Sequence, residues 1–391
     1  MKPLYLAWRY IAHHRWKTAI LCVCVTLTLY LPFAAHRILQ EFQRDWMARA
    51  ESTPLVVGAK GSSFDLTLHA LYFKTAALDS VPMAEVERIG DSGYALAVPL
   101  FLKHTAQDYP VVGTSLDYLD WRGLEVAEGS GLTLLGDCLL GSAVAEDLGL
   151  KPGDRILTDP ENVFDIAGAY PLNMLVRGVL AETGTPDDNA IFTDIKTAWI
   201  VEGLGHGHQD LAEVADEGVI MERAEGRITA NAALEQFTVI TEENLNSFHF
   251  HAEENELPAT AVIALPYDAK SAVLLRGRYE SPSAEAQILV PSAVVADIMD
   301  MIFRIKRLFD ASTLLIALTT ALFLLLVVLL SLRLRARERR IMADLGCARG
   351  TIAAVLAAEL TIVFAISVLL AAALTALTLP IAGGVIRQIF F

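Results

Sequence analysis

The stretch RLRARERRIMADLGCARGT, residues 333–351, separates two long apolar runs in a chain of 391 residues. It holds five arginines within eight residues, directly after the uncharged run at residues 313–332. Arginine and lysine accumulate at the cytoplasmic ends of membrane-spanning helices. We therefore expect this stretch to lie in the cytoplasm, between two membrane spans.

Three apolar runs, at residues 18–35, 313–332 and roughly 352–379, have the length of about 17 to 25 residues that a spanning helix needs. Basic residues also precede the first run: Lys2, Arg9, Arg15 and Lys17. The first and second runs thus each have a cytoplasmic end, and the long section between them is expected outside. A cleaved signal peptide fits poorly, because Pro32 and Phe33 stand where a small residue is needed.

This layout predicts an α/β membrane protein with three transmembrane helices, stalk helices and a large mixed α/β periplasmic domain inserted between spans 1 and 2. Residues 1–36 would be the cytoplasmic N-terminus and first span, and residues 37–310 the stalk and periplasmic core. Residues 311–391 would hold the remaining spans around the cytoplasmic turn at 333–351.

Two sets of apolar residues at helical spacing flank the exported section, one at residues 38–47 and one at residues 298–309. They indicate either helices that extend the spans outward as a stalk or amphipathic helices on the domain surface. Between them, branched residues bounded by turns predict strands at residues 55–57, 94–101, 109–112, 155–157, 174–180, 190–192, 237–240, 259–265 and 286–290. Helices are expected at residues 83–89, 142–148 and 194–201.

Charge and cysteine content narrow the chemistry of the exported section. Of the four cysteines only Cys138 lies there, so no disulfide within the chain can staple it. The formal net charge is −15, and residues 202–256 hold thirteen acidic residues against Arg223 and Arg227. This acidic insertion argues against binding to nucleic acid or to anionic lipid headgroups.

The sequence shows no enzyme motif. The segment GAKGSS at residues 58–63 lacks the spacing of a phosphate-binding loop. There is no Gly-x-Ser-x-Gly elbow and no His-Glu-x-x-His helix. We predict that the chain is not itself an enzyme and has no catalytic residues.

Three segments resemble the ABC transporter permeases that include the macrolide exporter, the lipoprotein-releasing complex and the FtsX-like proteins. LLGSAVAEDLGLKPGDRI at residues 139–156 is similar to the helix, turn and strand unit of that family's periplasmic core domain. LVRGVLAETGTPDDNAIF at residues 175–192 resembles the pair of strands that follows. RERRIMADLGCARGTI at residues 337–352 resembles the cytoplasmic turn between the second and third spans.

The resemblance implies a permease without an ATP site, paired with a separate ABC ATPase that binds ATP and Mg²⁺. In such proteins the ATPase pushes a short cytoplasmic helix and moves the spans and stalk. The implied coupling residues of this chain are Glu338, Arg339, Arg340, Ile341, Leu345 and Gly346. A simpler reading, in which the arginines only set membrane orientation, fits Arg333 and Arg335 best.

The family also implies a homodimer in a bacterial inner membrane, surrounded by membrane lipid, with a periplasmic or lipoprotein partner. Family members normally have four spans, whereas residues 380–391 cannot cross a hydrocarbon core about 30 Å thick. We expect three spans and a short outer tail.

Two His-x-His pairs in the acidic insertion, His206 with His208 and His249 with His251, are candidate metal ligands. On an extended strand both imidazoles of such a pair point to one face, and neutral ring nitrogens suit zinc or copper. The alternative is a solvated acidic loop whose histidines never converge.

Two functions follow. The first is a permease that couples ATP hydrolysis by a partner to periplasmic movement and to export or extraction of a substrate, with a link to zinc handling if the histidines bind metal. The second is a membrane-anchored periplasmic sensor or scaffold without transport activity. Sequence alone names no substrate.

Overall fold

The computed structural model describes residues 3–160, 171–207, 220–224, 227–230, 238–281, 284–334 and 336–390. The chain divides into two compact units. The first comprises residues 1–46 and 297–390, and the second residues 47–296.

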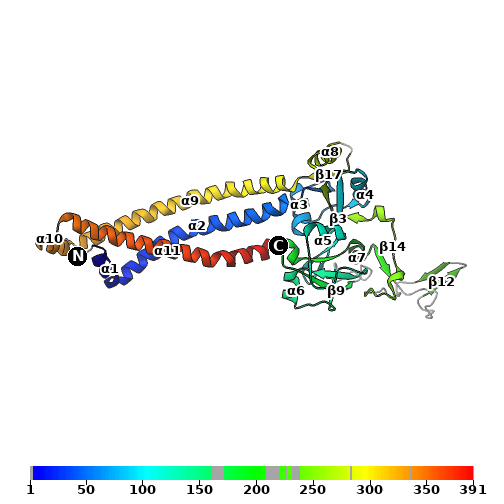
Figure 1. Ribbon diagram of the computed structural model, residues 1–391, viewed down its shortest axis with the longest axis horizontal. Helices are drawn as coiled ribbons and strands as arrows, with labels where there is room; N and C mark the ends of the chain where they lie inside the picture. Colours follow the sequence, from blue (N-terminus) through cyan, green and yellow to red (C-terminus); the bar gives the residue numbers. More distant parts are fainter. Residues whose placement is uncertain are drawn as a thin grey trace. The chain divides into compact units, whose positions relative to one another are not determined.

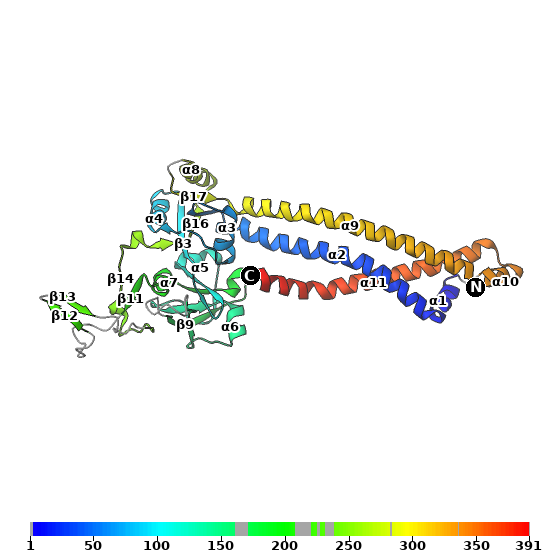
Figure 2. The ribbon, with the colours of Figure 1, turned by 180° about the vertical axis from the view of Figure 1, so that it is seen from behind.

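The first unit is helical. Its elements are α1 (Pro3–His13), most of α2 (Arg15–Glu51), most of α9 (Pro291–Leu334), α10 (Ala336–Asp344) and α11 (Arg349–Phe390). Figures 1 and 2 show the parts of α2, α9 and α11 in this unit running side by side. α2 and α9 each continue without a break through the residues predicted as stalk, so these residues do not form separate surface helices.

Hydroxyl side chains connect the long helices. Thr26 donates to the carbonyl of Ser367 at 3.4 Å, and Ser367 donates to the carbonyl of Cys22 at 3.3 Å, which joins α2 to α11. Thr28 bonds the hydroxyl of Thr320 on α9 at 3.4 Å. Small and hydroxyl residues allow such close approach between helices in lipid.

Among the described residues, two helices are long and apolar enough to cross a membrane, Arg15–Glu51 and Gly350–Pro380. They contain the first and third predicted spans. The second predicted span lies within α9, several of whose side chains fall outside the described part. The count of three spans therefore stays a prediction.

The second unit is a mixed α/β domain, as predicted. An eleven-stranded sheet has the order β17-β1-β16-β3-β5-β10-β7-β9-β6, with β4 paired to β5 and β8 to β9. Its strands are β1 (Leu55–Ala59), β3 (Ala95–Phe101), β4 (Thr105–Ala106), β5 (Tyr109–Thr114), β6 (Val126–Gly129), β7 (Asp137–Leu140), β8 (Arg155–Leu157), β9 (Asn173–Leu180), β10 (Ile191–Asp194), β16 (Ala261–Pro266) and β17 (Ala286–Leu289).

Three short two-stranded sheets complete the strands of the described residues. They are β2 (Val81–Pro82) with β15 (Pro258–Ala259), β11 (Gly205–Gly207) with β14 (Phe248–Phe250), and β12 (Ile220–Ala224) with β13 (Arg227–Ala230). The helices are α3 (Ser63–Tyr72), α4 (Ala84–Asp91), α5 (Leu116–Arg122), α6 (Ser142–Leu148), α7 (Ile195–Val201) and α8 (Ala269–Tyr279), with short 3₁₀ turns η1 (Pro186–Asn189), η2 (Leu245–Ser247) and η3 (Glu254–Glu256).

Two apolar cores lie on different parts of the sheet. One gathers side chains of β7, β9, β10 and α6, including Leu140, Val176 and Ile191. The other gathers side chains of β1, β16, α4 and α8, including Val57, Val262 and Leu275. Between sheet and insertion, the fully buried Trp199 of α7 packs with Phe101 and donates its ring N–H to the carbonyl of Pro258 at 2.7 Å.

Most predicted elements are present with shifted ends. The strand predicted at residues 237–240 is wrong over its described residues, because 238–240 form a bend and an irregular segment. There Thr238 and Val239 give their carbonyls to Asn173 and Asn244, so that the segment makes single bonds instead of a ladder. Residue 237 lies outside the described residues.

Candidate functional site

The histidine pairs of the acidic insertion are positioned by the short sheet of β11 and β14. In this antiparallel pair His206 lies directly opposite His249. His251 follows two residues after His249, and its backbone N–H donates to the carbonyl of Leu204 at 3.5 Å. Opposed residues and residues two apart share one face of a sheet. The three imidazoles therefore lie on the same face.

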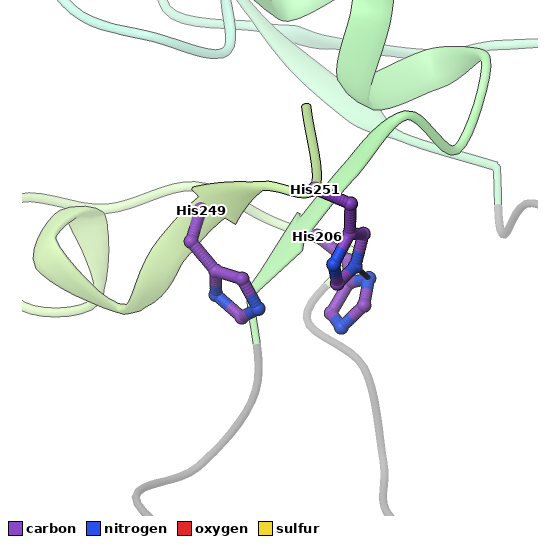
Figure 3. Close-up of side chains that lie close together, drawn as sticks. All are labelled: His206, His249 and His251. Atoms are coloured by element: carbon purple, nitrogen blue, oxygen red, sulfur yellow. Dashed lines mark hydrogen bonds between the residues drawn. The ribbon is translucent and has the colours of Figure 1, made fainter. Parts of the chain in front are cut away.

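Distances between the rings show how closely they gather. Nε2 of His251 lies 3.3 Å from Nδ1 of His206, and one ring nitrogen of each of the three histidines lies within 4.8 Å of the others. Figure 3 shows the rings of His206 and His251 joined by this contact, with His249 reaching toward them from the neighbouring strand. His206 is half-buried, and the other two are exposed. His208, the fourth predicted ligand, lies outside the described residues.

The opposite face of this sheet is apolar and explains why the histidines face outward. Gly205 pairs with Phe250 and Gly207 with Phe248, and each ring lies over its glycine. A Cβ at Gly205 would come within 2.7 Å of the Phe250 ring, and one at Gly207 within 2.6 Å of the Phe248 ring. Phe250 also meets the ring of Trp199 edge to face, with centroids 6.0 Å apart. The phenylalanines pack on the domain core, which leaves the histidine face toward solvent.

A carboxylate beside β11 binds two basic groups that sequence reasoning missed. Glu202 accepts from Lys103 at 2.8 Å and contacts Nε2 of the buried His104 at 2.6 Å. Burial alone would raise the pKa of Glu202, but the hydrogen bonds from His104 and Lys103 outweigh it and lower the pKa. The contact fixes the exit of α7 toward β11.

A buried ion pair holds the last turn of α2 in the second unit. Arg49 makes two parallel bonds to Asp187 of η1, at 2.6 and 2.9 Å, and both side chains are at most 6% exposed. The hydroxyl of Tyr118 donates to Asp187 at 2.7 Å and accepts from Arg49 at 2.9 Å. We call Arg49, Asp187 and Tyr118 the Arg49 knot.

Further bonds surround the Arg49 knot. The guanidinium of Arg122 donates to the hydroxyls of Ser52 at 2.9 Å and Thr53 at 2.7 Å, just after α2 ends. Burial and the charge of Arg49 lower the pKa of Arg122 to about 10. The chain after α2 is thus held by side chains of α5 as well as by Asp187. No sequence motif marks these residues, because Arg49 and Asp187 are far apart along the chain.

The predicted coupling residues belong to α10 and to the turn after it. Ile341 is 52% exposed and Leu345 is 79% exposed, and Arg340 is exposed too. Gly346 has φ +83°, and the N–H of Cys347 donates to the carbonyl of Met342 at 3.0 Å. This is a Schellman ending, in which glycine supplies the left-handed residue. The side chains of Glu338 and Arg339 lie outside the described part.

Comparison with known proteins decides the family. A family model described as the MacB-like periplasmic core domain matches residues 37–231, about half of the chain. The chain belongs to the MacB/FtsX-like family of ABC transporter permeases. Two of the three segments that resembled these permeases lie within the matched residues: residues 139–156 form α6, a turn and part of β8, and residues 175–192 run from β9 into β10. The third, residues 337–352, lies outside the matched residues and stays a prediction.

The solved structures that align with the chain include two transporter domains. The periplasmic region of MacB from Actinobacillus actinomycetemcomitans is 10% identical with a TM-score of 0.35, over 63% of this chain and 92% of that one. The extracellular domain of the noncanonic ABC-type transporter YknZ from Gram-positive bacteria is 13% identical with a TM-score of 0.32, over 60% and 98%. No curated protein matches the chain.

Membership in the MacB/FtsX-like family gives the chain a permease-type role with a periplasmic domain and transmembrane helices. Permease components of this family are not enzymes themselves, and the family implies an ABC ATPase as partner. The domain and the candidate spanning helices indicate an inner-membrane protein.

Removing one partner of the Arg49 knot should strongly destabilise the periplasmic domain. In Asp187→Ala the guanidinium of Arg49 stays buried without its carboxylate, which costs about 3 to 5 kcal/mol in unfolding free energy. The control is Glu254→Ala, which removes an exposed pair with Lys196 and should cost no more than about 1 kcal/mol. The free energy of unfolding of both variants is measured by denaturant unfolding of the purified protein, followed by circular dichroism. An equal loss of stability in the two variants would contradict the stabilising role of the Arg49 knot.

The Arg49 knot should also make stability depend on pH. Burial would raise the pKa of Asp187, but the charge and hydrogen bonds of Arg49 outweigh it and hold the pKa below the ordinary 3.8. The stabilisation is therefore fully present above pH 3.8 and is lost as the pH falls through the lowered folded-state pKa. Unfolding measured from pH 7 to pH 2 should show a shallower acid decline in Asp187→Asn than in the wild type. An identical decline would contradict this assignment.

Proposed function

We propose that this chain is the force-transmitting permease subunit of an ABC transporter whose separate ATPase docks on α10. Movement of the ATPase would pass through the long helices and move the periplasmic domain, which would then export or extract a substrate. A homodimer working with two ATPases is part of this proposal. It is supported foremost by the MacB-like periplasmic core domain in a chain that also carries α10.

The surface of α10 supports docking. Ile341 and Leu345 are four residues apart, so they lie on one face of the helix end. Both are largely exposed, although each would gain about 1.5 to 3 kcal/mol from full burial. The exposed Arg340 could pair with an acidic group of the ATPase. Glu338 and Arg339 are proposed as further charged contacts from sequence alone.

The connection of α2 to the domain supports force transmission. α2 is one helix from Arg15 to Glu51, and its last turn carries Arg49. A movement of this helix would reach the sheet through the Arg49 knot, because Asp187 lies just before β10. In this proposal, the Arg49 knot is the point at which the movement of α2 reaches the domain.

A charge placed on the apolar face of α10 should uncouple the ATPase. In Leu345→Asp an interface anchor becomes an acid, which should weaken association by about 2 kcal/mol, roughly thirtyfold. The measurement is ATP hydrolysis that copurifies with the tagged chain from its native membrane. Val273→Asp is the matched control, because Val273 is 66% exposed on α8 of the periplasmic domain. Unchanged ATP hydrolysis in Leu345→Asp would favour a sensor or scaffold instead.

The turn at the end of α10 should affect docking of the ATPase through its backbone conformation alone. A Cβ at Gly346 would meet no atom within 4 Å, so Gly346→Ala adds only the cost of a left-handed backbone, about 1 kcal/mol. We expect ATP hydrolysis to fall partly in Gly346→Ala. ATP hydrolysis should fall less in Gly346→Asn, since asparagine tolerates the left-handed conformation better than alanine. The reverse order of the two variants would argue against a role for this turn in docking.

A further inference from the structure

We propose that His206, His249 and His251 bind one divalent transition-metal ion of the zinc and copper class, and that the ion closes the base of the acidic insertion. The site goes beyond the permease role and does not depend on it.

Two of the ligands already stand at the right separation. In a tetrahedral zinc site with Zn–N bonds of about 2.0 to 2.1 Å, two ligand nitrogens lie about 3.3 to 3.4 Å apart. Nε2 of His251 and Nδ1 of His206 are 3.3 Å apart. In the metal-bound form the ring that donates this hydrogen bond would carry its proton on the other nitrogen, so both rings bind as neutral ligands.

The third ligand has its proton placed by a backbone group. Nδ1 of His249 lies 3.1 Å from the carbonyl oxygen of Ser247. A carbonyl only accepts, so Nδ1 carries the proton and Nε2 carries the lone pair. Metal-ligating histidines commonly donate their other ring N–H to a backbone carbonyl in this way. Since the three ligand atoms lie within 4.8 Å, His249 needs a shift of roughly 1 to 1.5 Å to reach tetrahedral spacing.

Strand pairing and packing already place these rings on one side of the sheet. The ladder of β11 and β14 sets His206 opposite His249, and Phe248 and Phe250 anchor the other face on the core. Their rings need the bare backbone of Gly205 and Gly207. The sequence Gly-His-Gly against Phe-His-Phe-His therefore aims every imidazole to the same side, before any ion binds.

The ligands come from both ends of the acidic insertion. His206 lies before residues 208–247, and His249 and His251 lie after them. One ion bound to all three would tie His206, which precedes this segment, to His249 and His251, which follow it. This is the sense in which the ion closes the base of the insertion.

The chemistry of the donors selects the ion. Imidazole nitrogens suit zinc and copper, whereas calcium and magnesium prefer oxygen ligands. The exposed carboxylates of Glu253 and Glu256, which follow His251 closely in the sequence, add negative charge that attracts a cation. Three histidines leave the fourth tetrahedral position open to water or to an external ligand.

Zinc titration of the full-length protein in detergent, after chelator treatment, tests the site. We expect one tight Zn²⁺ per chain by calorimetry, with a Kd near or below about 1 µM. Each of His206→Ala, His249→Ala and His251→Ala should weaken this binding at least tenfold. His36→Ala, which removes an exposed histidine of α2, should leave it unchanged. Equal binding in the triple variant and the wild type would overturn the proposal.

Two measurements on the wild type keep the test independent of variant folding. X-ray absorption of the zinc-loaded protein should show Zn–N distances of about 2.0 to 2.1 Å with imidazole scattering. A zinc environment without imidazole would overturn the proposal. So would displacement of zinc by equal concentrations of Ca²⁺ or Mg²⁺, because carboxylates would then hold the ion. Neither measurement needs an ATPase, so failure here leaves the permease function standing, and the reverse also holds.

Discussion

The bidentate ion pair between Arg49 and Asp187 is the constraint on which the periplasmic domain depends. A guanidinium and a carboxylate taken out of water must be paired and fully hydrogen-bonded, or their desolvation cost outweighs their attraction. Here Tyr118 and the carbonyl of Leu71 supply the remaining partners. The pair therefore tolerates only one arrangement of the last turn of α2, of η1 and of α5. β10 begins at Ile191, shortly after η1 ends at Asn189, so the pair also positions the start of this strand.

In the proposals above, the apolar side chains at the end of α10 would receive the ATPase, whereas the three histidines would bind a metal ion. These two parts depend on different kinds of interaction. Docking on α10 would depend on apolar burial and would tolerate other apolar side chains of similar size. Metal binding at β11 and β14 would depend on where the ring nitrogens lie, so it would tolerate few changes in the strands that hold them.

Sequence patterns predicted much of the fold, but only where a few neighbouring residues decide the local structure. β8 and α6 are found at the predicted ends, because the alternation of β8 and the glycines around α6 are contained in a few residues. β7 was missed, since Asp137, Cys138 and two leucines are too few to distinguish a strand from a loop. The candidate site needed long-range information: the His-x-His pairs were visible, but only the pairing of β11 with β14 shows that His206 meets His249. For the Arg49 knot no local pattern exists.

Under the proposed function, the Arg49 knot would carry a movement of α2 into the sheet. A connection between two elements transmits movement only if it is harder to break than the elements are to shift. An exposed pair such as Lys196 and Glu254 contributes at most about 1 kcal/mol and would break first. Separating the buried pair costs about 3 to 5 kcal/mol, because each charge would remain in the interior alone. A permease that works by moving its outer domain therefore gains from a buried charge at this point, even though an apolar contact there could be just as stable.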